Sequence, residues 1–75
     1  MIDNVNETRS LNNFGSNLKR LLNEKNLSRE EFADMIGLNS ARVIYDYEDG
    51  LKFPKTERFL EICIVLGQNM DDMLR

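Results

Sequence analysis

The segment SREEFADMIGLNSARVIYDYEDG, residues 28 to 50, contains two short helical patterns separated by a glycine. The run SREE opens the first pattern as a capping box, in which the Ser28 hydroxyl accepts from the Glu31 amide and the Glu31 carboxylate reaches back. Gly37 stands where helices often end on a left-handed residue. The spacing therefore predicts a helix of about eight residues, whose buried side consists of Phe32, Ala33 and Ile36.

The second pattern follows a tight connection and stops at Gly50. In the connection GLNS, either Asn39 or Ser40 is suited to be the N-cap of the next helix, which the spacing predicts over residues 41 to 48. Two short helices joined by a few residues, the first ending in glycine, are typical of the helix-turn-helix motif. An ordinary corner between two helices of a small bundle shares this pattern, so spacing alone leaves both interpretations open.

The flanking segments predict a compact all-α bundle of five short helices. Residues 1 to 11 are polar and lack a sustained apolar period, so we expect a flexible N-terminal arm followed by a domain over residues 12 to 75. Apolar residues at helical spacing predict helices from about 13 to 25 and from about 56 to 66. A final turn or two is expected between residues 69 and 74.

Length and composition restrict the classes of protein to which the chain can belong. A chain of 75 residues allows one domain with one modest core. Without histidine and with the single cysteine Cys63, we expect no His-based catalysis, no His- or Cys-ligated metal and no cofactor, and therefore no enzyme. We find no apolar run that could span a bilayer and no secretory signal, and so expect a cytoplasmic protein without a membrane partner or a small-molecule substrate.

The second helix of the pair has two different faces on a helical wheel. Three residues cluster on a face expected to point to the core: Val43, Ile44 and Tyr47. The opposite face carries Arg42, Tyr45, Asp46 and Asp49. Arginine can bond guanine in the major groove, aspartate can accept from cytosine, and tyrosine can contact a phosphate or a thymine methyl group. Arg42 and Asp46 lie four apart and are placed to pair, but such a surface pair contributes only about 0–1 kcal/mol and does not require a DNA-binding function.

Basic residues surround this pair of helices although the chain as a whole is acidic. Thirteen acidic residues against ten basic ones give a net charge of −3, whereas nucleic-acid-binding domains are usually basic. Local placement matters more for groove binding than the total charge. The candidate phosphate contacts are Arg9, Arg29, Lys52 and Lys55. Each alone is more often a solvated charge, but their convergence on one helix pair favours a phosphate-binding role.

From about residue 17 to residue 74 the sequence resembles the lambda-repressor/Cro-like helix-turn-helix family, also called the XRE family. The resemblance rests on NLKRLLNEKNLSREEFADMIG, VIYDYEDG, FPKTERFLEICIVLG and NMDDML taken together. It implies a five-helix domain, commonly dimeric on DNA, that represses or activates transcription in bacteria and their phages. We therefore expect a repressor of phage or mobile-element type that binds double-stranded DNA.

The resemblance also implies roles for individual positions. Base reading is expected at the start of the helix over residues 41 to 48 and one turn further on: Ser40, Ala41, Arg42, Tyr45 and Asp46. Phosphate contacts are expected at Arg29, where family members have glutamine, and near Lys52 and Lys55.

The chain departs from the family pattern at three places. Family members often pair an arginine of the first helix with a glutamate near the end of the third, but here Leu22 occupies the arginine position and Glu48 lacks that partner. The segment from Gly37 to Gly50 is one residue longer than usual. Ala41 and Asp46 replace the amides often found at reading positions. These departures bear on which DNA site the domain would recognise.

Apolar residues off the core stripe of the helix over residues 56 to 66 are candidates for a homodimer interface. Leu60 and Ile64 lie four apart on it, and three further candidates follow: Val65, Met70 and Met73. A dimer would roughly double the phosphate contacts of a domain that neutralises few phosphates alone. Packing of these residues beneath the arm or the last helix is the alternative.

A second class of function stays open, a helical protein-interaction module such as an antirepressor or another protein's regulatory subunit, with little affinity for DNA. The acidic net charge and the carboxylates of Asp46 and Asp49 favour it. Salt-dependent binding to duplex DNA separates the two classes.

Overall fold

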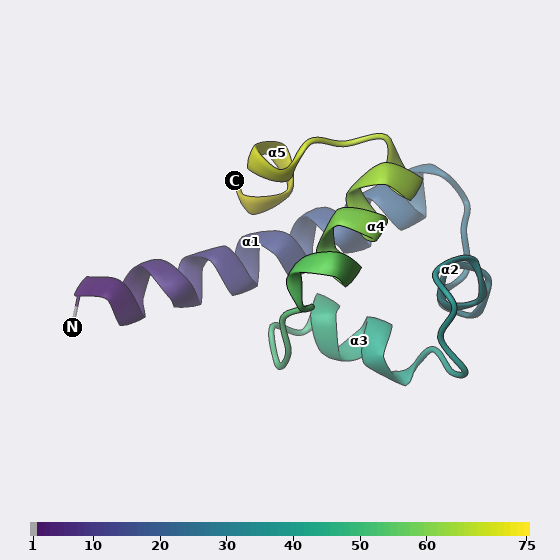
Figure 1. The fold of residues 1–75 in the computed structure, drawn as a ribbon, viewed down its shortest axis with the longest axis horizontal. Coiled ribbons are helices and arrows are strands. Elements are labelled where there is room, and N and C mark those ends of the chain that lie inside the picture. Colours follow the sequence, from purple (N-terminus) through teal and green to yellow (C-terminus); the bar gives the residue numbers. More distant parts are fainter. Residues whose placement is uncertain (1) are drawn as a thin grey trace.

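The computed structural model describes the backbone of residues 2–75 and the side chains from Asn12 onward. These residues form five α-helices and no strand: α1 (Ile2–Glu24), α2 (Arg29–Met35), α3 (Arg42–Glu48), α4 (Thr56–Leu66) and α5 (Met70–Leu74). The expected all-α, five-helix fold is confirmed. Figure 1 shows the C-terminal half of α1 among the other helices and its N-terminal half extending beyond them. No helix in the described range is long and apolar enough to cross a membrane.

The first helix is much longer than the sequence predicted. Its expected start near residue 13 is wrong, because α1 runs without a break from Ile2 to Glu24. The helical spacing of apolar residues indicates a helix only where one of its faces is buried, and the segment that extends beyond the bundle has few apolar residues. No glycine or proline interrupts residues 2 to 14, so nothing in the sequence stops the helix earlier. The side chain of Arg9 lies outside the residues whose side chains are described.

Four helices end in the same way, on a left-handed residue followed by a pair of backward hydrogen bonds. The left-handed residues have φ of +57°, +75°, +74° and +68° at Asn26, Gly37, Gly50 and Gly67 respectively. The amide after each of them bonds to a carbonyl five residues back, as in Leu38 N to Ala33 O at 2.8 Å and Leu51 N to Asp46 O at 2.9 Å. This is the Schellman geometry, which satisfies carbonyls at the helix end. The expected stops at Gly37, Gly50 and Gly67 are confirmed.

The core forms where α1 crosses the other helices. Its fully buried side chains come from all five helices: Phe14, Leu18, Leu22, Phe32, Ile36, Ile44, Ile62, Leu66 and Met73. Gly15 lets α1 approach the end of α3 closely, because a Cβ at this position would lie 2.5 Å from the Tyr47 carbonyl oxygen. Phe14, the preceding residue, makes edge-to-face contacts with Tyr47, Phe53 and Phe59.

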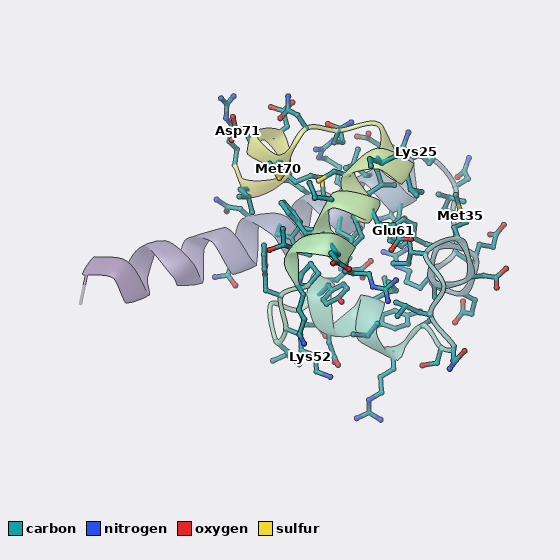
Figure 2. The ribbon with its side chains drawn as sticks, viewed as in Figure 1. Lys25, Met35, Lys52, Glu61, Met70 and Asp71 are labelled. Carbon is teal, nitrogen blue, oxygen red and sulfur yellow. The ribbon has the colours of Figure 1, made fainter. Side chains whose placement is uncertain are left out.

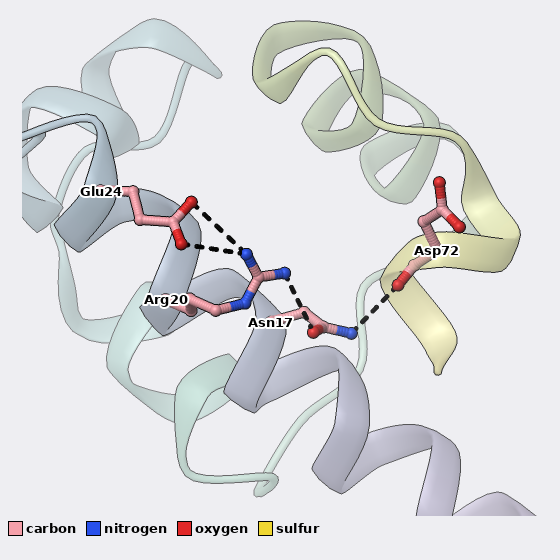
Figure 3. Close-up of polar contacts among 4 residues, drawn as sticks. All are labelled: Asn17, Arg20, Glu24 and Asp72. Atoms are coloured by element: carbon pink, nitrogen blue, oxygen red, sulfur yellow. Dashed lines mark hydrogen bonds and ion pairs between the residues drawn. The ribbon is translucent and has the colours of Figure 1, made fainter.

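Amide side chains of α1 fasten the short α5. Asn17 Nδ2 donates to the carbonyls of Asp72 at 3.1 Å and Met73 at 2.9 Å, and Asn13 Nδ2 donates to Leu74 O at 3.3 Å. Figure 3 shows the Asn17 contact beside the Arg20–Glu24 pair on the same helix. These amides satisfy carbonyls that a helix of five residues leaves unpaired. Together with the buried Met73, they hold the C-terminus against α1.

Candidate nucleic-acid interface

The α2–α3 pair has the local structure that its sequence predicts. The Ser28 hydroxyl accepts from the Glu31 amide at 3.0 Å, and the Ser28 amide donates to the Glu31 carboxylate at 3.1 Å. These two bonds complete the capping box, and the bond from the Ser28 amide is the main cause that lowers the pKa of the Glu31 carboxyl. On α3, Ile44 and Tyr47 are buried and Val43 packs partly against the core. The predicted inner face of α3 is therefore confirmed.

The start of α3 differs from the prediction. Neither Asn39 nor Ser40 caps the helix; the N-cap is Ala41, which makes no side-chain capping bond. The Ala41 side chain is only 7% exposed and offers little surface to a base, and base reading at this residue stays a prediction. Packing of this methyl group has taken precedence over the usual preference for a polar cap. Ser40, one residue earlier, is exposed.

The outward face of α3 presents fewer reading groups than expected. Arg42, Tyr45 and Asp49 are exposed. Asp46, in contrast, has a side chain only 20% exposed, and its carboxylate lies 3.5 Å from Lys52 Nζ. The expected Arg42–Asp46 pair is absent among the side chains of residues 12–75. Asp46 thus pairs with the loop cation Lys52 and not with the Arg42 guanidinium.

Arg29 belongs to a largely buried ion pair that links α2 to α3. Its Nε donates to Glu48 Oε2 at 2.7 Å, and its Nη1 donates to Asn23 Oδ1 at 3.0 Å. The side chains of Arg29 and Glu48 are only 15% and 5% exposed. The phosphate contact expected at Arg29 stays a prediction, and it would have to compete with the Glu48 carboxylate for the guanidinium. Glu48 therefore pairs with an arginine of α2, whereas family members often pair this glutamate with an arginine of the first helix.

The surface around α3 divides into an acidic and a basic side. On the α2 side, Glu30, Glu31 and Asp34 are exposed and line a shallow hollow together with Ser40 and Ala41. On the other side, Lys52 and Lys55 are exposed in the loop between α3 and α4. A phosphate backbone would therefore be attracted at the loop side and repelled along α2.

Sequence reasoning missed Arg58, which lies beside this loop in the first turn of α4. Its Nη1 donates to the Ile36 carbonyl at the end of α2 and to Glu61 Oε1 at 3.1 Å. Arg58 thereby joins the start of α4 to the turn of the helix-turn-helix pair. No pattern in the sequence indicates this contact, because an isolated arginine in an exposed helical turn is usually solvated.

The candidate dimer surface on α4 is smaller than expected. Ile64 is 77% exposed, Leu60 is also exposed, and Val65 is half-buried. These three residues line a shallow groove with Glu57 and Glu61. Met73 is fully buried in the core, so its assignment to a partner surface is wrong. Among the candidates, Met73 alone is fully buried, as the alternative of packing within the bundle requires.

Two short helices joined by a tight turn, the first opened by a capping box and ended by a left-handed glycine, form a helix-turn-helix unit. Comparison with known families agrees: the sequence profile described as "Helix-turn-helix" matches residues 18–73. Because the match covers most of the chain, the protein belongs to this helix-turn-helix family, the lambda-repressor or XRE type that the sequence suggested. No curated protein matches the chain.

Proposed function

We propose that the protein is a sequence-specific transcriptional regulator, a cytoplasmic repressor of phage or mobile-element type, that inserts α3 into the major groove of double-stranded DNA. The exposed Arg42 carries the proposal. Its guanidinium takes part in no ion pair among the side chains of residues 12–75, and it lies in the first turn of α3. Such a group can bond O6 and N7 of guanine together. Ser40 and Tyr45, both exposed, are the neighbouring base contacts.

The phosphate contacts of this proposal come from the loop after α3. Lys52 is 61% exposed, and its pairing with Asp46 at 3.5 Å is the kind of surface pair that contributes little and exchanges readily. Lys55 is exposed and takes part in no ion pair within the same described part of the chain. With Arg9 of α1 as a third contact, each domain neutralises about two or three phosphates, which predicts a slope of roughly −2 to −3 in log affinity against log salt.

The experiment begins with selection of bound duplexes from a random pool, followed by affinity measurements on the selected site and on a scrambled duplex. Arg42→Ala is expected to reduce the preference for the selected site by about 1–3 kcal/mol. Lys55→Ala is the matched control: it should weaken binding to both duplexes alike and reduce the salt slope by about one. Equal losses on both duplexes for Arg42→Ala would contradict its role as a base reader. A reporter whose promoter overlaps the selected site then tests repression.

The proposed regulator acts as a homodimer through Leu60, Ile64 and Val65 of α4. An isoleucine exposed to 77% on a helix is unusual in a monomer when a second exposed leucine lies one turn away. A two-fold dimer would place two α3 helices on half-sites roughly 34–36 Å apart. Ile64→Lys should convert the dimer to a monomer in sedimentation, whereas the same change at the exposed Met35 of α2 should not. Unchanged sedimentation of Ile64→Lys would refute this interface.

One set of observations favours a second function, that of a protein-interaction module with little DNA affinity. Arg29 is withdrawn into the fold, and Glu30, Glu31 and Asp34 remain exposed beside α3. In that case the protein would not bind duplex DNA even at low salt, where phosphate attraction is strongest.

A further inference from the structure

A pocket of about 560 Å³ lies between the inner side of α3, the loop of residues 51–55 and the first two turns of α4. Its size is within the range of small-molecule sites. Val43, Phe53 and Pro54 supply apolar walls. Phe53 remains 41% exposed although its ring packs at 5.1 Å from Phe14 and 5.4 Å from Phe59, measured between ring centroids. The aromatic wall is thus held rigidly while one surface stays open to a ligand.

Tyr47 brings a hydrogen-bond donor to this pocket. The residue is only 6% exposed and lines the pocket, yet its hydroxyl has no hydrogen-bond partner among the side chains and backbone of residues 12–75. Burial raises the pKa of this hydroxyl above its usual value of 10.0, although the positive charge of Arg58 acts in the opposite direction. Tyr47 is therefore a neutral donor at physiological pH. None of the buried side-chain oxygens and nitrogens of the described residues lacks a hydrogen-bond partner, so the unpaired Tyr47 hydroxyl is accessible to solvent and, at this pocket, to a ligand.

Three cations line the same pocket: Lys52, Lys55 and Arg58. Arg58 is held by the Ile36 carbonyl and Glu61 through Nη1 alone, which leaves its other guanidinium nitrogens available. Lys55 is the N-cap of α4 and makes no side-chain capping bond, so the positive end of an eleven-residue helix also opens here. Glu57 and Glu61 stand on the rim, and Glu61 is already paired with Arg58. The pocket lining thus carries three cations against two carboxylates, and two of the cations, Lys52 and Arg58, are already paired with Asp46 and Glu61.

We propose that this pocket binds a small organic carboxylate with an apolar body, such as an aromatic acid. The carboxylate would accept from the Tyr47 hydroxyl and the Arg58 guanidinium, with Lys55 nearby, while the apolar body lies against Phe53, Pro54 and Val43. Charge and wall chemistry together define this class. An inorganic anion would leave the apolar walls uncovered, and a neutral apolar compound would leave the hydroxyl unpaired.

Such a ligand would touch both parts of the proposed DNA interface. Val43 and Tyr47 belong to α3, and Lys55 is a proposed phosphate contact. The ligand would therefore compete with the DNA backbone for Lys55 and act as an inducer. This regulatory consequence rests on the proposed function, whereas ligand binding itself does not.

The test of the site uses isotope-labelled protein without DNA, titrated with sodium phenylacetate and observed through its backbone amide resonances. Saturable shifts are expected at Tyr47 and at residues 52–58. The neutral isostere phenylacetamide, and acetate, which lacks the ring, should each bind at least about tenfold more weakly. Tyr47→Phe, which keeps the ring, should weaken phenylacetate by about tenfold without changing the thermal midpoint at neutral pH. Lys55→Gln should weaken the binding of phenylacetate severalfold. Lys19→Gln, at an exposed position of α1, should leave this binding unchanged.

Three results would each overturn the proposal. Phenylacetamide could bind as tightly as phenylacetate, or the resonance shifts could be scattered over the molecule. The third such result is that Tyr47→Phe and Lys55→Gln both keep the full affinity for phenylacetate. If Tyr47→Phe instead weakens DNA binding and phenylacetate shifts nothing, the pocket is a phosphate contact and the proposal is wrong. A separate DNA titration with saturating phenylacetate should show reduced DNA affinity. If the protein binds no DNA, the titration with phenylacetate still tests the pocket. Failure of the proposed DNA-binding function can therefore be distinguished from failure of the ligand site.

Discussion

The Arg29–Glu48 pair joins the two helices of the helix-turn-helix unit from within. Glu48 stands at the end of α3 and Arg29 at the start of α2, so their 2.7 Å contact fixes the angle at which α3 is presented. Asn23 extends the contact to α1. A buried pair of this kind adds little net stability relative to apolar residues, but loss of one partner leaves an uncompensated charge. Its role in this domain is to position α3.

A double-mutant cycle tests this role. Glu48→Leu alone should lower the free energy of unfolding by about 3–5 kcal/mol, because the largely buried Arg29 guanidinium then has no carboxylate to balance its charge and keeps only the hydrogen bond to Asn23. Arg29→Met combined with Glu48→Leu should recover most of that loss. Urea unfolding followed by circular dichroism measures all four proteins. Strictly additive effects of the two changes would show that the pair is not coupled.

Burial of the Tyr47 hydroxyl makes stability sensitive to alkaline pH. Burial raises the pKa of Tyr47 in the folded state above 10.0, so its contribution is fully present below that value and is lost as pH rises through the folded pKa. Thermal unfolding should show the wild type losing stability relative to Tyr47→Phe from about pH 10 upward. A constant difference between the two proteins from pH 7 to pH 11 would contradict the raised pKa. Burial also raises the pKa of Cys63, but that residue is present in both proteins.

At the residue scale, burial on the apolar face of α3 could be predicted from the sequence but ionic partners could not. The wheel correctly assigned Ile44 and Tyr47 to the core because one apolar face leaves few choices. Long charged side chains reach several residues, and tertiary geometry selects among them. Asp46 therefore pairs with Lys52 instead of Arg42, and Arg29 turns inward.

At the scale of elements, helix ends were predictable where local chemistry determines them. The glycines and the Ser28 capping box act within a few residues, and α4 has the range that its spacing predicted. The start of α1 was not predictable, because a helix that extends beyond its packing partners has no apolar period. The close contact between α1 and α3 at Gly15 was also missed, since nothing around a glycine within a helix shows which backbone it approaches.

Gly15→Ala reverses the usual effect of alanine in a helix. Alanine would normally stabilise a helix by about 1 kcal/mol relative to glycine. Here the added Cβ would lie 2.5 Å and 2.6 Å from the carbonyl oxygens of Tyr47 and Glu48, and backbone cannot move aside easily. We expect a net loss of about 1–3 kcal/mol in the free energy of unfolding. Ser16→Ala, at the next and exposed position of α1, is the control and should be neutral or slightly stabilising. A stabilised Gly15→Ala protein would show that α1 and α3 are not in close contact.

At the scale of the whole molecule, charge distribution decides how the domain could meet a duplex. The net charge of −3 describes no particular surface. The structure separates an acidic edge along α2 from a basic loop after α3, and withdraws Arg29 from the acidic edge. A DNA complex would therefore be anchored mainly from the loop side. This asymmetry could not be predicted from composition, because it depends on which basic side chains form ion pairs inside the fold.

The double change Glu30→Gln and Asp34→Asn tests this asymmetry. If α2 borders the bound duplex, removal of two negative charges should raise DNA affinity by roughly threefold to tenfold at low salt, equally on selected and scrambled duplexes, and the gain should fade as salt rises. The control, Asp71→Asn with Asp72→Asn, makes the same change in net charge on α5, and Figure 2 places Asp71 on the side of the molecule opposite Lys52. Equal gains for both variants would mean that only net charge matters. If the DNA affinity of the α2 variant does not rise, the duplex approaches another face of the molecule. The proposed insertion of α3 into the major groove would then be wrong.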